Sequence, residues 1–291
     1  MNLNLNLKLL CFSISVIVFS FFNCAGKSIE KINDNTDIND LTNKSIEYWN
    51  QRTNPDALKK AEILISQIIE KQPGNFESSI LLGKIKYIQG YFFENNLEER
   101  KILFSEGSEI CKNAVLTHPD FYNMFPNFDK NNTDQLLDVL NKAPKSTLPG
   151  LYWWGQNLIL YLNDKPVIER LNNRELMEQI MHRVVALDPG YDFSGPFRFF
   201  GILYSRIPGL DLSKSNTYFG KAIKANPQFL GNKLMFAEFY HQKAGNKEKF
   251  NYILNEILNR NLTKHPELMA ENFLIQKKAQ TLLDNESSLF E

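Results

Sequence analysis

Four histidines are the side chains of this 291-residue chain best suited to metal binding or acid–base catalysis. Metal and catalytic sites require several such groups that converge on one point. His118 and His265 each precede a proline at a predicted helix end. His182 falls on the polar side of a helical pattern, and His241 follows Tyr240 near another helix end. None has a partner at ligand spacing, so we expect no metal, no cofactor and no catalytic histidine.

Other signs of catalysis are also missing from the sequence. It contains no Gly-x-Gly-x-x-Gly or P-loop pattern, no His-Glu-x-x-His, no Cys-x-x-Cys and no Gly-x-Ser-x-Gly. Cys111 occupies an apolar slot of a helical pattern, so a buried small side chain is a better interpretation than a nucleophile. The sequence therefore indicates a protein that is not an enzyme.

Charge and composition exclude two further classes of protein. The 33 Lys and Arg residues balance 33 Asp and Glu residues, so the chain lacks the basic excess of a nucleic-acid-binding protein. Hydrophobic residues make up 43% of the chain and aromatic residues 12%, which is far more than a disordered chain contains. We expect a packed domain without affinity for nucleic acid.

The N-terminal segment is typical of an exported lipoprotein. Its apolar run, Leu9–Phe22, is too short to span a bilayer as a helix and is followed by small residues. Residues 21–24 resemble a bacterial lipobox, with Phe and Asn where the usual pattern has Leu and Gly or Ala. We expect a signal peptide over residues 1–23 and a lipid on Cys24 that anchors the chain to a membrane in the periplasm. Ordinary signal cleavage and an uncleaved anchor are the alternatives.

Beyond the cysteine, residues 24–42 are polar and rich in Asn and Asp, which predicts a linker. From residue 43 to 291 the pattern is helical. Apolar residues recur 12, 9, 8, 5 and 4 positions before each of four prolines, Pro73, Pro119, Pro189 and Pro227. This stripe is one face of an α-helix, and the proline ends each helix.

A second helix after each of these prolines would complete a helical hairpin of the tetratricopeptide kind. The spacing between prolines is irregular, which predicts insertions. The 70 residues between Pro119 and Pro189 have room for an additional helical pair, with Asp134–Leu140 and Tyr152–Leu162 as candidates. The expected fold is all-α, a tetratricopeptide-like solenoid of hairpins with insertions over residues 43–291.

Two aromatic clusters are candidate ligand-binding surfaces. Consecutive rings at Tyr152 to Trp154 spread around more than half a helix, so one neighbouring helix cannot bury them all. A second cluster surrounds Gly195-Pro196. One interpretation is core packing; the other is an apolar cleft with Asn157 or Arg198 at its edge. The predicted ligand-binding residues are Tyr152, Trp153, Trp154, Asn157, Phe197, Phe200, Tyr204 and Tyr240.

Five landmarks follow one another along the C-terminal half. They are Leu151-Tyr152-Trp153-Trp154, Ala186-Leu187-Asp188-Pro189-x-Tyr191, Phe200-Gly201, Ile207-Pro208-Gly209 and Tyr218-Phe219-x-Lys221-Ala222. In this order they resemble the T-component family associated with TRAP transporters (TatT type). The resemblance covers roughly residues 151–290 and, more loosely, residues 63–115.

That resemblance implies a periplasmic lipoprotein that partners a TRAP solute-binding protein, the P-component. It further implies a homo-oligomer, a trimer, with an apolar cleft or pore for a small hydrophobic or organic-acid ligand. The alternative is a tetratricopeptide scaffold that mediates protein–protein interactions in envelope assembly. Lys and Arg on the first helices of the predicted repeats are too sparse to favour this scaffold.

Overall fold

The structure, a computed structural model, describes residues 37–290. The predicted signal peptide, the lipid site at Cys24 and most of the linker lie outside the described residues. Within residues 37–290 the regular secondary structure consists of helices joined by turns and loops, without a strand, which confirms the all-α class. None of the helices described is long and apolar enough to cross a membrane.

The helices follow one another with short connections. Their bounds are α1 (Ile38–Asn50), α2 (Pro55–Lys71), α3 (Phe76–Ile88), the π-helix η1 (Gln89–Phe93), α4 (Leu97–Thr117), α5 (Pro119–Met124), α6 (Thr133–Leu140), η2 (Lys145–Thr147), α7 (Leu148–Asn163), α8 (Val167–Asn172), α9 (Arg174–Leu187), α10 (Tyr191–Arg206), α11 (Leu212–Ala225), α12 (Gly231–Met235), the π-helix η3 (Phe236–His241), α13 (Lys247–Leu258), η4 (Leu262–Lys264), η5 (Pro266–Leu268), α14 (Met269–Asp284) and α15 (Glu286–Leu289).

The predicted proline stops are confirmed. Helices α2, α4, α9 and α11 each end two residues before Pro73, Pro119, Pro189 and Pro227, respectively. Most of the apolar stripe in each helix is buried. Each proline disfavours helical backbone at the residue that precedes it, and this residue is the first one after the helix. Each helix therefore ends where the sequence predicts.

The first helix begins earlier than the periodicity predicts. Helical structure is expected from about Asn43, whereas α1 already starts at Ile38. The carboxylate of Asp37 accepts a hydrogen bond from the backbone N–H of Asn39 at 3.3 Å and caps the helix, while Leu41 is buried on its inner face. The segment from Ile38 to residue 42 therefore belongs to α1 and not to the linker.

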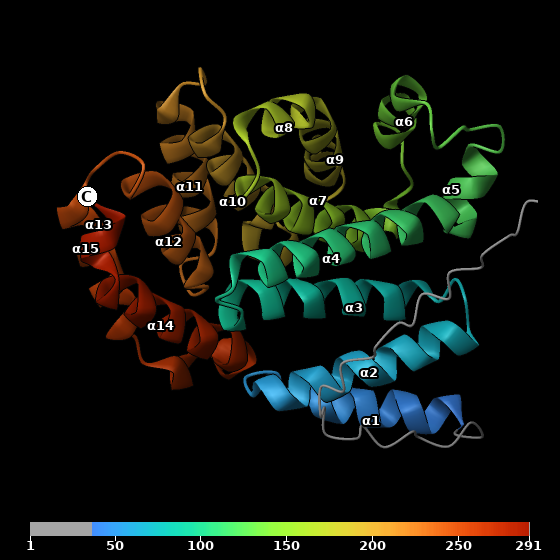
Figure 1. Cartoon of the computed structure of the whole chain (residues 1–291), viewed down its shortest axis with the longest axis horizontal. Helices are drawn as coiled ribbons and strands as arrows, with labels where there is room; N and C mark the ends of the chain where they lie inside the picture. Colours follow the sequence, from blue (N-terminus) through green and yellow to red (C-terminus); the bar gives the residue numbers. More distant parts are fainter. Residues whose placement is uncertain (1–36, 291) are drawn as a thin grey trace, which may run out of the picture. The chain divides into compact units, whose positions relative to one another are not determined.

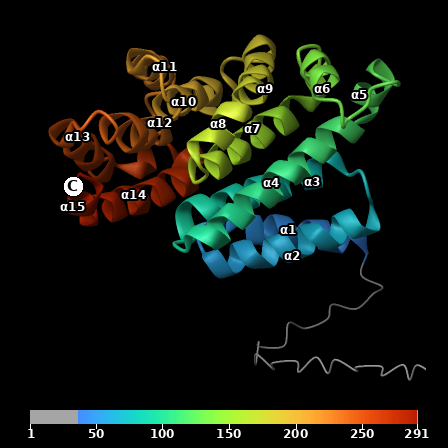
Figure 2. The ribbon, with the colours of Figure 1, turned by 45° about the horizontal axis from the view of Figure 1, so that its top comes forward.

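Neighbouring helices pack in successive hairpins: α1 with α2, α3 with α4, α10 with α11, and α13 with α14. Figures 1 and 2 show α1 and α2 beside each other, next to the α3–α4 pair. The two candidate helices of the long insertion exist as α6 and α7. They do not form a pair of their own, because α6 packs on α9 and α7 packs chiefly on α4. The hairpins are compatible with a solenoid, and its tetratricopeptide character stays a prediction.

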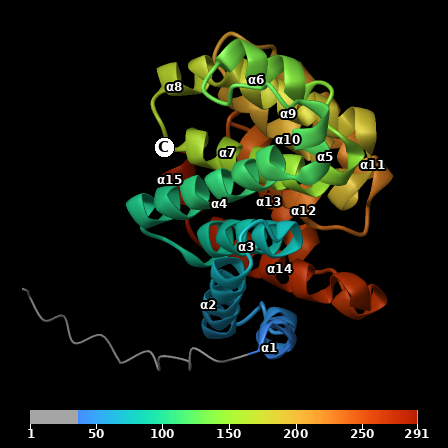
Figure 3. The same ribbon diagram turned by 90° about the vertical axis from the view of Figure 1, so that its right-hand side faces the viewer.

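Small residues allow α3, α4 and α7 to approach one another closely. A Cβ atom on Gly83 would lie 2.2 Å from Sγ of Cys111, and one on Gly107 would lie 2.5 Å from Oδ1 of Asn157. The Asn157 amide donates to the Gly83 carbonyl at 3.1 Å. These contacts fix α3 against α7, the two helices that carry Lys84 and Trp153. In addition, α14 contacts η1, which directly follows α3. Figure 3 shows α14 next to α3.

Candidate functional site

A mostly apolar pocket of about 70 Å³ lies where α3 and η1 face α7, α10, α12 and α14. Its lining combines aromatic and aliphatic side chains with three cations and two carboxylates. The lining residues are Arg52, Lys84, Tyr87, Ile88, Tyr91, Phe92, Trp153, Asp192, Phe193, Arg198, Phe229, Gly231, Leu234, Met235, Glu271, Leu274 and Ile275. Since one water needs roughly 10–15 Å³ of such space, the pocket has room for about five to seven waters or one small organic molecule.

Two π-helices meet beside the pocket. On α3 and η1, Lys84, Tyr87, Ile88 and Tyr91 follow the i, i+3, i+4, i+7 spacing and all line the pocket. The Tyr91 hydroxyl of η1 donates a hydrogen bond to the Glu238 carboxylate of η3, which joins the two π-helices. π-helical turns interrupt the regular hydrogen-bond ladder and occur frequently at functional sites.

A third irregular segment forms another wall. Asp192, Phe193 and Ser194 at the start of α10 have φ angles of 48°, 58° and 61°. This is left-handed helical backbone, which costs L-residues roughly 1–2 kcal/mol each. Such backbone persists only where its surroundings hold it, and it concentrates at functional sites.

Each residue of this left-handed turn is held by a hydrogen bond to its side chain or carbonyl. Asn232 donates its amide to the carbonyl of Phe193 at 3.1 Å, and Asn226 donates to the Ser194 hydroxyl at 2.7 Å. Asp192 is bound through its carboxylate, as described next. The turn is thus fixed by groups from the α11–α12 region as well as from α10.

Arg198 lines the pocket and is the centre of a buried polar network, with 3% of its surface exposed. Its guanidinium donates to the Asp192 carboxylate at 2.7 Å, to the Tyr152 hydroxyl at 2.8 Å and to the Asn232 amide oxygen at 2.7 Å. The Phe229 ring lies 5.0 Å from the guanidinium carbon. Burial raises the pKa of Tyr152 well above its usual value; Arg198 opposes the shift and Asp192 reinforces it. Tyr152 therefore stays protonated and donates to Asp192.

At the opposite side of the pocket, Arg52 and Glu271 form a bidentate ion pair. Nε and Nη2 of Arg52 lie 3.0 and 2.9 Å from the two carboxylate oxygens. The side chains are 14% and 23% exposed, respectively. This pair links the end of α1 to α14, which is far away in the sequence. Glu271 thus neutralises the charge of Arg52, as Asp192 neutralises that of Arg198.

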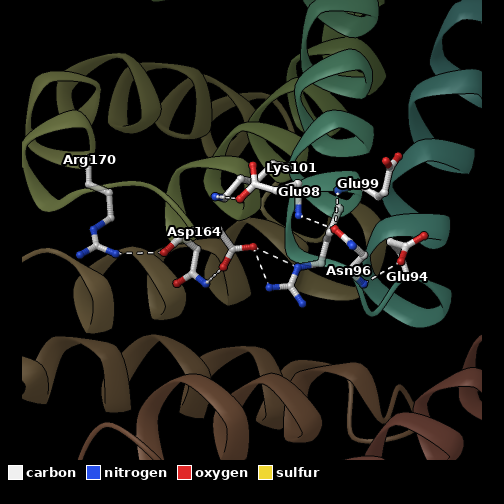
Figure 4. Close-up of polar contacts among 9 residues, drawn as sticks. Glu94, Asn96, Glu98, Glu99, Lys101, Asp164 and Arg170 are labelled. Carbon is white, nitrogen blue, oxygen red and sulfur yellow. Dashed lines mark hydrogen bonds and ion pairs between the residues drawn. The ribbon is translucent and has the colours of Figure 1, made fainter.

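A second, smaller pocket of about 60 Å³ shares Tyr91 with the first. Here Arg100 of α4 donates to Oδ2 of Asp164 at 3.0 and 2.8 Å, and Arg170 donates to the carbonyl of Asn163 at 3.0 Å. Figure 4 shows Asp164 and Arg170 among these contacts. The ring of Tyr91 stands between a largely apolar pocket and a charged one.

Two of the eight predicted ligand-binding residues belong to the first pocket or its immediate wall. Trp153 lines the pocket. Tyr152 is fully buried behind it and reaches the wall through Arg198 and Asp192. The rings at 152 and 153 contact each other edge to face, with centroids 5.1 Å apart.

The other six do not line this pocket. Trp154 and Asn157 are buried in the core, and the Asn157 amide bonds to carbonyls of Trp153 and Gly83 at 2.9 and 3.1 Å. Asn157 therefore fastens helices together and does not stand at the edge of a cleft. The remaining rings lie on the α10–α11 face or on η3: Phe197, Phe200 and Tyr204 contact Tyr218, and Tyr240 stacks on Phe236. Ligand binding by any of the eight stays a prediction.

Sequence reasoning missed the contribution of α1, α3 and α14 to the pocket. The sequence does indicate Lys84, Tyr87 and Tyr91, because their spacing places a cation and two aromatic rings on one face of a helix. It does not indicate Arg52 and Glu271, since they meet only in the folded chain.

His118 caps a helix, and His241 and Cys111 are buried in the fold. The His118 ring accepts the backbone N–H of Asp120 at 3.2 Å and caps α5. Burial lowers the pKa of His241, with a further contribution from Lys249. Burial raises the pKa of the Cys111 thiol, which is fully buried. Between residues 37 and 290, no group of His, Cys, Asp and Glu is arranged to hold a metal.

The TRAP transporter T-component family matches residues 93–290 of the chain. The chain belongs to this family. As a T-component it is an accessory part of a TRAP-type transport system. The matched region includes Trp153, the left-handed turn, Arg198 and Glu271, whereas Arg52, Lys84 and Tyr87 precede it. No curated protein matches the chain significantly.

Proposed function

We propose that this T-component is a lipid-anchored periplasmic protein that holds a small hydrophobic or organic-acid ligand in the pocket beside Trp153. It does so together with the solute-binding P-component of the same transport system. The lipid on Cys24 would keep the protein at the membrane, beside the transporter. Assembly into a trimer is part of the proposal.

The observation that carries the proposal is the pocket itself. It is mostly apolar, large enough for one small organic molecule, and lined in part by the π-helix η1 and by a strained left-handed turn. Pockets of this kind, with a few polar groups among aromatic side chains, are typical of small-ligand sites. Apolar surface removed from water favours binding by roughly 25 cal/mol per Å².

Native mass spectrometry of the full-length protein, with and without its P-component, tests the proposal. We expect a complex of the two proteins and a small molecule that remains bound to the T-component. Trp153→Ala should lose the small molecule and keep the fold. Tyr252→Ala, at a ring that is 62% exposed, is the control and should retain it.

A complex that forms without any small molecule, and that Trp153→Ala leaves unchanged, would favour the scaffold alternative. The proposal fails outright if the protein forms no complex and retains no ligand.

A further inference from the structure

We infer that the pocket beside Trp153 takes a ligand with a single carboxylate and that Lys84 binds this carboxylate. The inference rests on the proposed function, because it names the ligand class of the same pocket. It concerns a residue that the family match, which begins at residue 93, does not reach.

The charges of the pocket single out Lys84. Three cations line it, and two of them have carboxylate partners: Arg198 pairs with Asp192, and Arg52 pairs with Glu271. Lys84 forms no ion pair and no hydrogen bond with any residue in the described part of the chain. It is the one pocket cation there whose charge no protein carboxylate neutralises.

Two indole rings hold the Lys84 ammonium in place. Its Nζ lies 5.1 Å from the ring centroid of Trp49 and 5.3 Å from that of Trp153. Cation–π contacts at these distances position the ammonium without cancelling its charge. An ammonium carries three hydrogen-bond donors, so a ligand carboxylate can accept from it directly, and charge-assisted bonds of this type are strong.

A second donor stands one helical turn along α3. Tyr87 lines the same pocket, and its hydroxyl has no hydrogen-bond partner among residues 37–290. Burial raises the pKa of Tyr87, so the hydroxyl stays protonated. Lys84 and Tyr87 together would satisfy both oxygens of one carboxylate.

The rest of the pocket suits an apolar group and disfavours a second charge. Ile88, Leu274 and Ile275 line it, together with the rings of Phe193 and Phe229, which stack with centroids 4.8 Å apart. A second carboxylate here would be buried without a free cation, which is costly. The volume of about 70 Å³ limits the apolar part to a short chain or one small ring.

Three probes of equal chain length test this ligand class: hexanoate, hexan-1-ol and adipate. Each is titrated into the full-length protein, and binding is followed by tryptophan fluorescence. The chain has 3 Trp residues, and both that flank Lys84, Trp49 and Trp153, report on the pocket. We expect hexanoate to bind about tenfold or more tighter than hexan-1-ol, as a charge-assisted bond implies, and adipate to bind more weakly than hexanoate.

Substitutions at Lys84 assign the preference to this residue. In Lys84→Met, hexanoate should bind within about twofold of hexan-1-ol, because the charge is lost while the length of the side chain is kept. Lys84→Arg should retain the preference for the acid. Lys60→Met is the matched control, since Lys60 also lies over one ring, Tyr48, at 5.3 Å but does not line the pocket.

The outcomes separate this inference from the proposed function. Equal binding of acid and alcohol by the wild type, or an unchanged preference in Lys84→Met, overturns the inference and leaves the pocket as a ligand site. Adipate that binds as tightly as hexanoate overturns the single-carboxylate class. Failure of all three probes to bind overturns the inference and contradicts the proposed function as well.

Discussion

The guanidinium of Arg198 lies 2.7 Å from the carboxylate of Asp192, the first residue of the left-handed turn. This partly buried pair connects a strained stretch of backbone to the hydroxyl of Tyr152 on α7 and to Asn232 on α12. The same bonds that offset the strain of the turn therefore fix three walls of the pocket relative to one another.

Replacing Arg198 by Met should destabilise the protein strongly. The substitution leaves the Asp192 carboxylate partly buried without its cation and removes bonds to Tyr152 and Asn232, a loss of about 3–5 kcal/mol in the free energy of unfolding. Asp192→Asn should cost less, because Asn keeps a side-chain oxygen that can accept from Arg198 and, like Asp, tolerates left-handed backbone. Urea denaturation measures both variants, and the double variant should lose less than the sum of the two. A loss below about 1 kcal/mol in Arg198→Met would mean that the network does not hold the turn.

Because α3 and α4 approach each other closely at Gly83, a larger side chain there should destabilise the protein, and a smaller one at Cys111 should compensate. Gly83→Ala places a methyl group 2.2 Å from Sγ of Cys111 and should cost about 1–3 kcal/mol. Adding Cys111→Ala removes the clashing sulfur and should restore part of this stability. Gly220→Ala on α11 is the control, since its new methyl group meets nothing within 4 Å and should be neutral or slightly stabilising. Additive losses at positions 83 and 111 would contradict this packing.

Alkaline pH should destabilise the protein through its buried tyrosines. Burial raises the pKa of Tyr152 and Tyr91 well above the usual value, and burial followed by Asp192 raises that of Tyr191 to about 12. A group whose pKa is raised by folding stabilises the fold fully below its unfolded pKa, near 10, and this stability is lost as the pH rises through the folded pKa.

The free energy of unfolding, measured by urea denaturation between pH 9 and 11, should thus fall above about pH 10. Tyr152→Phe should make the decrease of this free energy with pH less steep, by up to about 1.4 kcal/mol per pH unit. Tyr122→Phe, at a ring that is 62% exposed, should keep the slope of the wild type. Identical slopes in all three proteins would show that Tyr152 does not titrate differently on folding.

Local sequence signals were sufficient for most of the fold. The apolar stripes before Pro73, Pro119, Pro189 and Pro227 specify helices, because the spacing of buried side chains and the proline stop are both local properties. The start of α1 was missed, since its stripe is short and the cap at Asp37 lies in a polar segment. The partners of α6 and α7 were also missed, because pairing across an insertion depends on contacts distant in the sequence.

The candidate site was only partly predictable for the same reason. Trp153 was found because consecutive large rings are conspicuous, but its contact with Lys84 joins residues 69 positions apart. The sequence does not indicate the left-handed turn at Asp192 to Ser194, because none of these three residues is the glycine that usually adopts such backbone. The position of Asn157 beside the rings predicts a place at a cleft edge, whereas its hydrogen bond to the carbonyl of Gly83, which is distant in the sequence, shows that it packs between helices.

A crystal structure of the full-length protein, grown with saturating hexanoate, tests the ligand pocket most directly. We expect density for one molecule between Trp153 and Ile275, with its carboxylate at Nζ of Lys84. An empty pocket at saturation, or a molecule bound instead on the α10–α11 face beside Phe200 and Tyr218, would contradict it.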